Sequence, residues 1–139
     1  MSWDAWCNLI VSENPDGTKV ESGAIIGQDG LVWAKTEGFP EMSEDSIKKV
    51  VDGFLDPSPV YTSGVMIGGE KYACVMADSE VIRVVTKRGG EEKTSTYAAA
   101  FYKTTTAVVV GIYEQPDPRV GKQAAKVQEV ARHLMDSGI

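Results

Sequence analysis

Hydrophobic residues recur at helical spacing in three parts of the chain. The first group follows Ser2, a good helix-capping residue, and comprises Trp3, Trp6, Cys7 and Ile10. The second follows Ser43 and comprises Ile47, Val50, Val51 and Phe54. The third comprises Val120, Ala124, Val127, Ala131 and Leu134. The spacing predicts three amphipathic helices, the first ended by the turn residues 14–17 and the last ending near Gly138.

Shorter apolar runs separated by turn residues predict β-strands. The turn at residues 27–30 contains Asp-Gly and lies between Gly23–Ile26 and Leu31–Ala34, which indicates a hairpin. The run Asp56-Pro57-Ser58-Pro59 is interpreted as a breaker, and further strands are predicted after it at Gly64–Ile67, Tyr72–Ala77, Val81–Thr86 and within Tyr97–Tyr102.

The continuous apolar run Ala107–Tyr113 is typical of a central strand that is buried on both faces. No repeat, linker or low-complexity segment interrupts the order of elements. That order predicts a single α+β domain over residues 1–139, with an antiparallel sheet and helices packed on its faces.

Composition and length indicate a folded cytoplasmic protein. The 139 residues suffice for one hydrophobic core, and 42% apolar with 24% charged residues argues against disorder. The N-terminus lacks the basic and apolar segments of a secretory signal, and no apolar run approaches the roughly 20 residues of a membrane helix. With only Cys7 and Cys74, no disulfide framework is indicated. We therefore expect a soluble protein that does not span a membrane.

Charge is distributed unevenly along the chain. Residues 1–70 carry 12 acidic and 4 basic side chains, a net charge of −8, whereas residues 71–139 carry 8 acidic and 10 basic ones, a net charge of +2. Either the second half presents a basic surface to an acidic partner, or the pattern is chance on a solvated surface. The total of −6 argues against a nucleic-acid partner, since phosphate contacts need an excess of Lys and Arg.

Few residues suggest catalysis or a metal site. His133 is the only histidine, so a His-based metal cluster is excluded. A nucleophilic dyad of Cys7 or Cys74 with His133 stays open, although both cysteines fall at positions typical of small core residues. The run Gly68-Gly69-Glu70-Lys71 lacks the Walker spacing and indicates a hairpin turn. We expect no catalytic residue, metal or cofactor, and favour a binding module.

Tryptophan is concentrated at the start of the chain, at Trp3, Trp6 and Trp33. Terminal helices usually fray, so two indoles three residues apart in such a helix need an explanation. They can anchor the helix to the sheet as core residues. Alternatively, they can form a flat aromatic surface of the kind that binds polyproline II segments.

Four motifs make the chain similar to the profilin family, and to its plant and protist members in particular. Residues 1–6 (MSWDAW) resemble the N-terminal Trp-x-x-Tyr signature, and residues 22–34 (SGAIIGQDGLVWA) resemble the hairpin of plant-type members. Residues 64–72 (GVMIGGEKY) match the Gly-Gly-x-Lys hairpin, and residues 109–116 (VVGIYEQP) match the last strand. The resemblance implies that the N- and C-terminal helices lie together on one face of the sheet and that a further helix lies on the other.

The resemblance also implies a site for proline-rich peptides between the terminal helices, formed by Trp3, Trp6, Trp33, His133 and the C-terminal residue Ile139. Trp6 stands in place of the usual tyrosine, which exchanges a hydroxyl donor for an indole N–H. Ile139 stands where an aromatic residue or methionine is often found. Both substitutions keep the site apolar.

A second surface, for monomeric actin, is implied at Tyr61, Thr62, Lys71, Ala73, Val75, Lys87, Arg119, Gly121, Lys122 and Glu129. Val85 and Ala125 stand where vertebrate members carry basic residues, so we expect a weaker electrostatic contribution. A weak phosphoinositide site is implied at Lys71, Lys87 and Arg88.

The sequence therefore predicts a non-enzymatic, cytoplasmic protein of the cytoskeleton that binds monomeric actin and regulates its polymerisation and nucleotide exchange. It would also bind proline-rich segments of assembly factors such as formins. Two alternatives are a phosphoinositide-binding regulatory module and a small cysteine hydrolase.

Overall fold

In the computed structural model, which describes residues 3–12, 20–88, 95–114 and 121–139, the described chain forms four helices and seven strands. The helices are α1 (Trp3–Ile10), α2 (Glu44–Gly53), α3 (Ser58–Ser63) and α4 (Gly121–Asp136). The strands are β1 (Ser22–Gly27), β2 (Val32–Lys35), β3 (Val65–Ile67), β4 (Glu70–Ala77), β5 (Val81–Arg88), β6 (Ser95–Lys103) and β7 (Ala107–Glu114). Within these residues no helix combines the length and the apolar character needed to cross a bilayer.

All seven strands belong to one sheet in the order β2-β1-β7-β6-β5-β4-β3, and each neighbouring pair is antiparallel. Strand β7 lies between β1 and β6, with Ser22 opposite Ile112 and Gly27 opposite Ala107. Its residues Ala107–Tyr113 are all buried, which confirms the prediction of a central strand.

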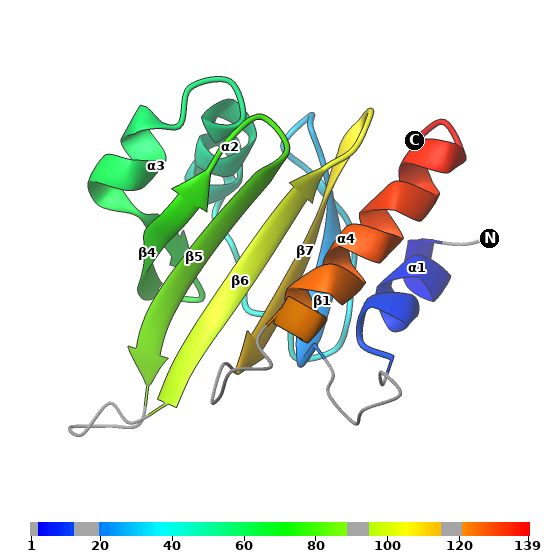
Figure 1. Ribbon diagram of the computed structural model, residues 1–139, viewed down its shortest axis with the longest axis horizontal. Helices are drawn as coiled ribbons and strands as arrows, with labels where there is room; N and C mark the ends of the chain where they lie inside the picture. Colours follow the sequence, from blue (N-terminus) through cyan, green and yellow to red (C-terminus); the bar gives the residue numbers. More distant parts are fainter. Residues whose placement is uncertain (1–2, 13–19, 89–94, 115–120) are drawn as a thin grey trace.

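The sheet separates two hydrophobic clusters, and helices cover both faces (Figure 1). On one face α1 and α4 contact each other and pack over β1, β6 and β7, with Ile10, Val109 and Leu134 completely buried. On the other face α2 and α3 cover a cluster that includes Val60 and Phe101. The predicted α+β arrangement, with the terminal helices together and a further helix opposite, is confirmed.

Two predicted hairpin turns are confirmed by their backbone geometry. Gly68 and Gly69 have φ angles of 59° and 82° between the paired residues Ile67 and Glu70. Positive φ at both central residues is what a two-residue hairpin of type I′ requires, and glycine adopts it at little cost. In the β1–β2 turn, the Asp29 carboxylate accepts a hydrogen bond of 3.0 Å from the Leu31 N–H.

Helix α2 begins as its sequence predicts. The Ser43 hydroxyl accepts a hydrogen bond of 3.2 Å from the Ser46 N–H, and so satisfies one of the free donors at the helix N-terminus. Glu44 and Asp45 lie in the first turn, where their negative charges interact favourably with the helix dipole and stabilise the helix. The predicted inward residues are buried (Ile47, Val50, Phe54) or packed at the edge of the cluster (Val51).

Helix α3 was not predicted, because its prolines were interpreted as a breaker. Pro57 is the N-cap, and Pro59 lies in the first turn. The N–H groups of these positions have no acceptor within the helix, so a proline, which lacks an N–H group, costs no helical hydrogen bond there. The Asp56 carboxylate accepts from the Ser58 N–H at 3.2 Å, and Val60 packs inward, fully buried. The interpretation of residues 56–59 as a simple breaker is therefore wrong.

Helix α4 ends in a Schellman motif. Gly138 has a φ of 83°, its N–H donates to the Met135 carbonyl at 3.0 Å, and the Ile139 N–H donates to the Leu134 carbonyl at 2.9 Å. Val127, Ala131 and Leu134 are buried as predicted. The other two residues of the predicted stripe, Val120 and the Ala124 side chain, lie outside the described residues, as does the predicted turn at 14–17.

Candidate functional site

Two aromatic rings from the terminal helices face each other on the surface of the molecule. The ring centroids of Trp6, on α1, and His133, on α4, are 6.2 Å apart with a tilt of 31° between the planes. Trp6 is partly buried against the cluster beneath the helices, whereas 52% of the His133 side chain is exposed. The pair can therefore contact a ligand from solvent while it remains fixed from below.

Trp33, on β2, packs against the same cluster and is also partly buried. Its indole ring covers the backbone of Gly27 so closely that a Cβ atom there would overlap the ring. Glycine at this position thus leaves room for the Trp33 indole and the Asp29 carboxylate next to the end of β1. The consequence is a third fixed aromatic ring on the α1 and α4 side of the sheet.

Ile139 is held by the turn between β6 and β7. Its carbonyl oxygen accepts hydrogen bonds from the Thr104 hydroxyl at 3.0 Å, the Thr106 N–H at 2.6 Å and the Thr106 hydroxyl at 3.2 Å. The Gln28 amide of the β1–β2 turn donates to the Thr104 carbonyl at 2.9 Å. Ile139 is thus tied to the β6–β7 turn, and Gln28 ties that turn to the β1–β2 turn.

We call Trp6, Trp33, His133 and Ile139 the aromatic site. All four lie on the same side of the sheet, as the sequence analysis expected. Trp3 is the first residue of α1, and its side chain lies outside the described part of the structure. The indoles of Trp6 and Trp33 are partly buried, so each packs against the core and also remains accessible to solvent.

Sequence reasoning missed the threonines and Gln28 that hold Ile139. The run Thr104-Thr105-Thr106 between two apolar strands was a signal, because hydroxyl groups in a turn often bond to nearby backbone. Nothing in the sequence, however, indicated that the partner would be the carbonyl of Ile139.

His133 has one acidic neighbour on its own helix. Its Nε2 atom lies 3.9 Å from the Glu129 carboxylate, one turn earlier. Both side chains are more than half exposed, so solvent screens the interaction and we expect it to contribute little to stability.

Three of the residues implied for actin binding lie on the exposed side of β4. Lys71 and Ala73 alternate with the buried Tyr72, and Val75, 61% exposed, stands at a β-bulge between Cys74 and Met76. Ala73 pairs with Val85, which packs against the cluster beneath α4. The outward face of β4 is therefore on the same side of the sheet as α4.

The remaining implied residues do not all lie on this face, because α3 packs on the opposite side of the sheet from α4. Tyr61 and Thr62 lie on α3, where the Tyr61 hydroxyl accepts from the Ala77 N–H at 2.8 Å, and Glu129 is exposed on α4. The others fall beyond the side chains that the structure describes. They are Arg119 and the side chains of Lys87 and Lys122, while Gly121 is placed at the start of α4. The side chain of Arg88, which is implied for the phosphoinositide site, also lies outside the described residues.

The cysteine positions do not support a hydrolase. Cys74 packs toward the α2 and α3 side of the sheet, whereas His133 is on α4 across it. Burial raises the pKa of the Cys74 thiol, which disfavours the reactive thiolate. Cys7 is only 1% exposed among core residues, so a substrate cannot reach it.

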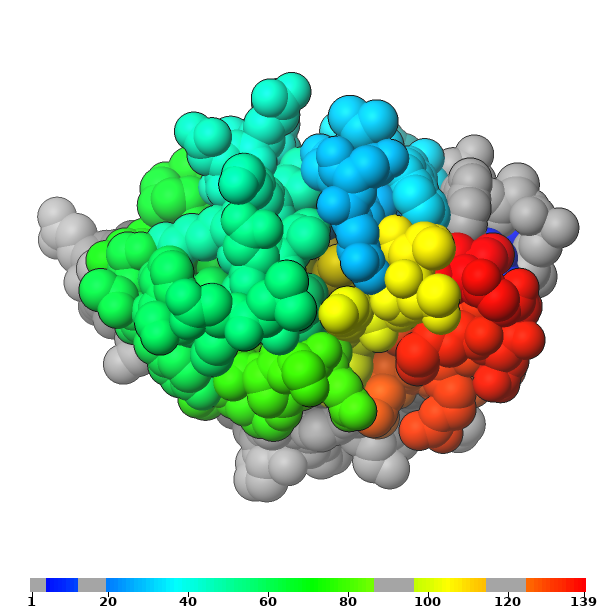
Figure 2. All heavy atoms as spheres, turned by 90° about the horizontal axis from the view of Figure 1, so that it is seen from above, coloured from blue at the N-terminus to red at the C-terminus, as the bar shows by residue number. Residues whose placement is uncertain are grey.

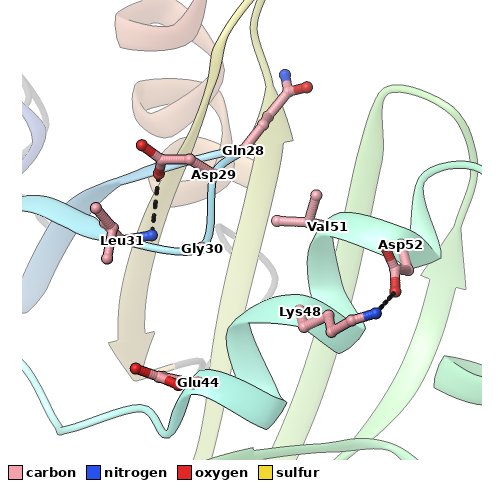
Figure 3. Close-up of a pocket in the computed structure, with 8 residues that line it drawn as sticks. All are labelled: Gln28, Asp29, Gly30, Leu31, Glu44, Lys48, Val51 and Asp52. Carbon is pink, nitrogen blue, oxygen red and sulfur yellow. Dashed lines mark hydrogen bonds and ion pairs between the residues drawn. The ribbon is translucent and has the colours of Figure 1, made fainter.

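A cavity of about 400 Å³ lies between the β1–β2 turn and α2 (Figure 3). Leu31 and Val51 provide its apolar walls. The Lys48 Nζ atom forms an ion pair with the Asp52 carboxylate at 3.2 Å. No residue of the aromatic site and none of the implied actin residues lines it.

Comparison with known proteins identifies the family. The family model for profilin matches residues 1–139. Acanthamoeba castellanii profilin IA is similar at 25% identity and a TM-score of 0.78, over 99% of this chain and 100% of that one. Human profilin II is 24% identical with a TM-score of 0.78, and the match covers 97% of this chain and 99% of the human one. Mouse profilin IIa, solved in complex with a double repeat from the FH1 domain of mDia1, shares 23% identity at 0.79 over the whole of both chains. The chain belongs to the profilin family.

Proposed function

We propose that this protein binds monomeric actin on one surface and proline-rich segments on another, and delivers actin to assembly factors. The observation that carries the proposal is the aromatic site, in which Trp6 and Trp33 pack against the core and still reach solvent, and the exposed ring of His133 lies beside Trp6. The role is that of a binding module and requires no bond-breaking step.

The geometry of the aromatic site suits a polyproline II ligand. Proline segments are already extended, so binding costs little chain entropy, and their rings pack against flat indoles. The indole N–H groups and the His133 ring can donate hydrogen bonds to the exposed proline carbonyls. Mouse profilin IIa, which has the same fold, was solved with a formin FH1 repeat, and this supports a ligand of the same class here.

The surface proposed for actin consists of Tyr61, Thr62, Lys71, Ala73, Val75 and Glu129, together with Lys87, Arg119, Gly121 and Lys122 from the family resemblance. No described helix covers the outward side of β4, so this part of the sheet is accessible to a large partner. Such a protein can accelerate nucleotide exchange on actin by binding an open actin cleft better than a closed one.

The proline-binding part is tested by adding a proline decamer and following tryptophan fluorescence. We expect a saturable change in the wild-type protein and none in Trp6→Ala. Leu9→Ala is the matched control, because Leu9 also packs on the same cluster from α1 but has no aromatic ring. A wild-type protein that ignores the decamer would overturn this part of the proposal.

The actin part is tested separately by calorimetric titration with monomeric actin and by the release rate of a fluorescent nucleotide from actin. We expect saturable binding and faster release. If neither occurs while the decamer binds, the actin surface is wrong and the aromatic site stands.

A further inference from the structure

A groove of about 460 Å³ lies between the C-terminal half of α4 and the adjoining ends of β4, β5 and β6. In Figure 2 the green residues of β4 and β5 and the orange-to-red residues of α4 occupy neighbouring parts of the surface. No residue of the aromatic site lines the groove, and none of those implied for actin does. Its chemistry is therefore not explained by the proposed function.

The walls of this groove are largely apolar. Met76 and Met135 stand on opposite sides, 40% and 45% exposed, and Tyr102 and Val81 contribute further apolar surface. Methionine is flexible and polarisable, so a methionine-lined surface adapts to the shape of a bound side chain. A volume of this size accepts one or two large apolar side chains.

Three cations surround these walls. Arg83 and Lys103 are half-buried and Arg132 is exposed, and all three line the groove. Among the residues that the structure describes, none of these three cations forms an ion pair with a carboxylate. The Arg83 guanidinium donates a long hydrogen bond of 3.5 Å to the Tyr113 hydroxyl.

The nearby carboxylates offset only part of this charge, because three cations and a single acidic residue line the groove. Asp78 is used within the β4–β5 turn, where it accepts from the N–H groups of Glu80 and Val81 at 2.8 and 2.9 Å. Glu80 is the one acidic residue among those lining the groove. A half-buried guanidinium that lacks an anionic partner is costly in the free protein and favours an anionic ligand.

We propose that this basic groove binds an acidic peptide segment that carries a large apolar side chain. The apolar side chain would enter between Met76 and Met135, and the flanking carboxylates would pair with Arg83, Lys103 and Arg132. Charge complementarity selects an acidic partner, and the apolar walls distinguish it from a purely electrostatic one.

The test uses the acetylated, amidated peptide Asp-Glu-Phe-Leu-Glu-Asp as the probe and protein with ¹³C-labelled methionine methyl groups. The methyl signals of Met76 and Met135 report on the groove, and those of buried Met42 and of Met66 on β3 are internal controls. We expect saturable shifts at Met76 and Met135 alone. Two matched peptides, Lys-Lys-Phe-Leu-Lys-Lys and Asp-Glu-Ser-Ser-Glu-Asp, should shift them at least about tenfold more weakly.

A charge reversal separates the groove from general charge effects. The double variant Lys103→Glu with Arg132→Glu should lose at least about tenfold in affinity for the acidic peptide and gain affinity for the lysine peptide. Lys35→Glu with Lys48→Glu changes the net charge equally, away from the groove, and should bind as the wild type does.

Three results would each overturn the proposal. The first is the absence of shifts at Met76 and Met135 at millimolar acidic peptide. The second is equal binding of the acidic and the lysine peptides. The third is a response of these methyl groups to phosphatidylserine vesicles but not to the peptide, which would assign the groove to a membrane surface instead. Each outcome is independent of whether actin or the proline decamer binds.

Discussion

The hydroxyl of Thr104 lies between two partners that belong to different parts of the chain. It donates a hydrogen bond of 3.0 Å to the carbonyl oxygen of Ile139, and it accepts one of 2.9 Å from the Ala107 N–H within its own turn. Thr104 is 3% exposed, so neither bond competes strongly with water. One buried side chain therefore closes the β6–β7 turn and fixes Ile139 of the aromatic site.

Thr104→Val should lower the free energy of unfolding by about 1–3 kcal/mol, because the buried Ala107 N–H loses its acceptor. Thr104→Ser retains the hydroxyl and should restore most of this loss. Thr105→Val, at the exposed neighbouring position, should stay within about 0.5 kcal/mol of the wild type. Urea unfolding followed by circular dichroism measures all three. Equal effects of Thr104→Val and Thr105→Val would contradict the role given to the Thr104 hydroxyl.

Gly27→Ala should displace both the Trp33 indole and the Asp29 carboxylate, since the added methyl group would overlap atoms of each. We expect a shifted tryptophan emission spectrum and a proline decamer affinity at least about threefold lower, because the aromatic site loses one fixed ring. Gly30→Asn is the control in the same turn. Gly30 has a φ of 92° and open space around it, and asparagine tolerates positive φ better than most residues. Unchanged emission and decamer binding in Gly27→Ala would show that the position of Trp33 does not matter for the ligand.

Lys71→Glu should weaken binding to monomeric actin by at least about tenfold without unfolding the protein, since charge reversal at an interface commonly costs more than about 1.4 kcal/mol. Lys71 is exposed on the outward side of β4 and makes no ion pair among the described residues. Lys35→Glu makes the same charge change on β2, at the opposite edge of the sheet. Calorimetric titration compares the variants. Should both bind actin as the wild type does, the actin surface lies elsewhere.

Cys74 should react with iodoacetamide more slowly in the folded protein than in urea. Burial raises the pKa of its thiol from 9.0, and this outweighs the lowering by the backbone hydrogen bond at Met76. Because the thiolate is the nucleophile, the alkylation rate in the folded state should rise at a higher pH than in the unfolded state.

The same shift has a consequence for stability. A raised thiol pKa stabilises the folded state fully below the unfolded pKa, and this contribution is lost as the pH rises through the folded pKa. Mass spectrometry of Cys74 alkylation as a function of pH, with and without urea, tests the sign. Identical pH profiles in the two states would refute it. Cys7, at 1% exposure, should react more slowly still in the folded protein.

Local features of the sequence determined the elements that depend on near neighbours. Three such features are the Ser43 cap, the apolar spacing of α2 and α4, and the Gly68-Gly69 turn. Each depends on residues only a few positions apart, so the sequence predicts it without knowledge of the fold. The motifs resembling profilins then placed the terminal helices on one face, and the structure agrees. The family resemblance also predicted the residues of the aromatic site, and the structure places Trp6, Trp33 and Ile139 against one cluster with His133 beside Trp6. Their role in binding stays a prediction.

Only the tertiary structure decided which distant segments meet. The pairing of β1 with β7 and the hydrogen bond from Thr104 to Ile139 join residues far apart in the chain, and neither partner identifies the other in the sequence. The basic groove likewise joins residues of β4, β5, β6 and α4, none of which is unusual in its own segment. Such contacts form because the apolar faces of all the elements have to be buried together. Few arrangements achieve this and also give every buried backbone N–H and C=O group a hydrogen-bond partner. That condition belongs to the whole chain and cannot be read from any one part of it.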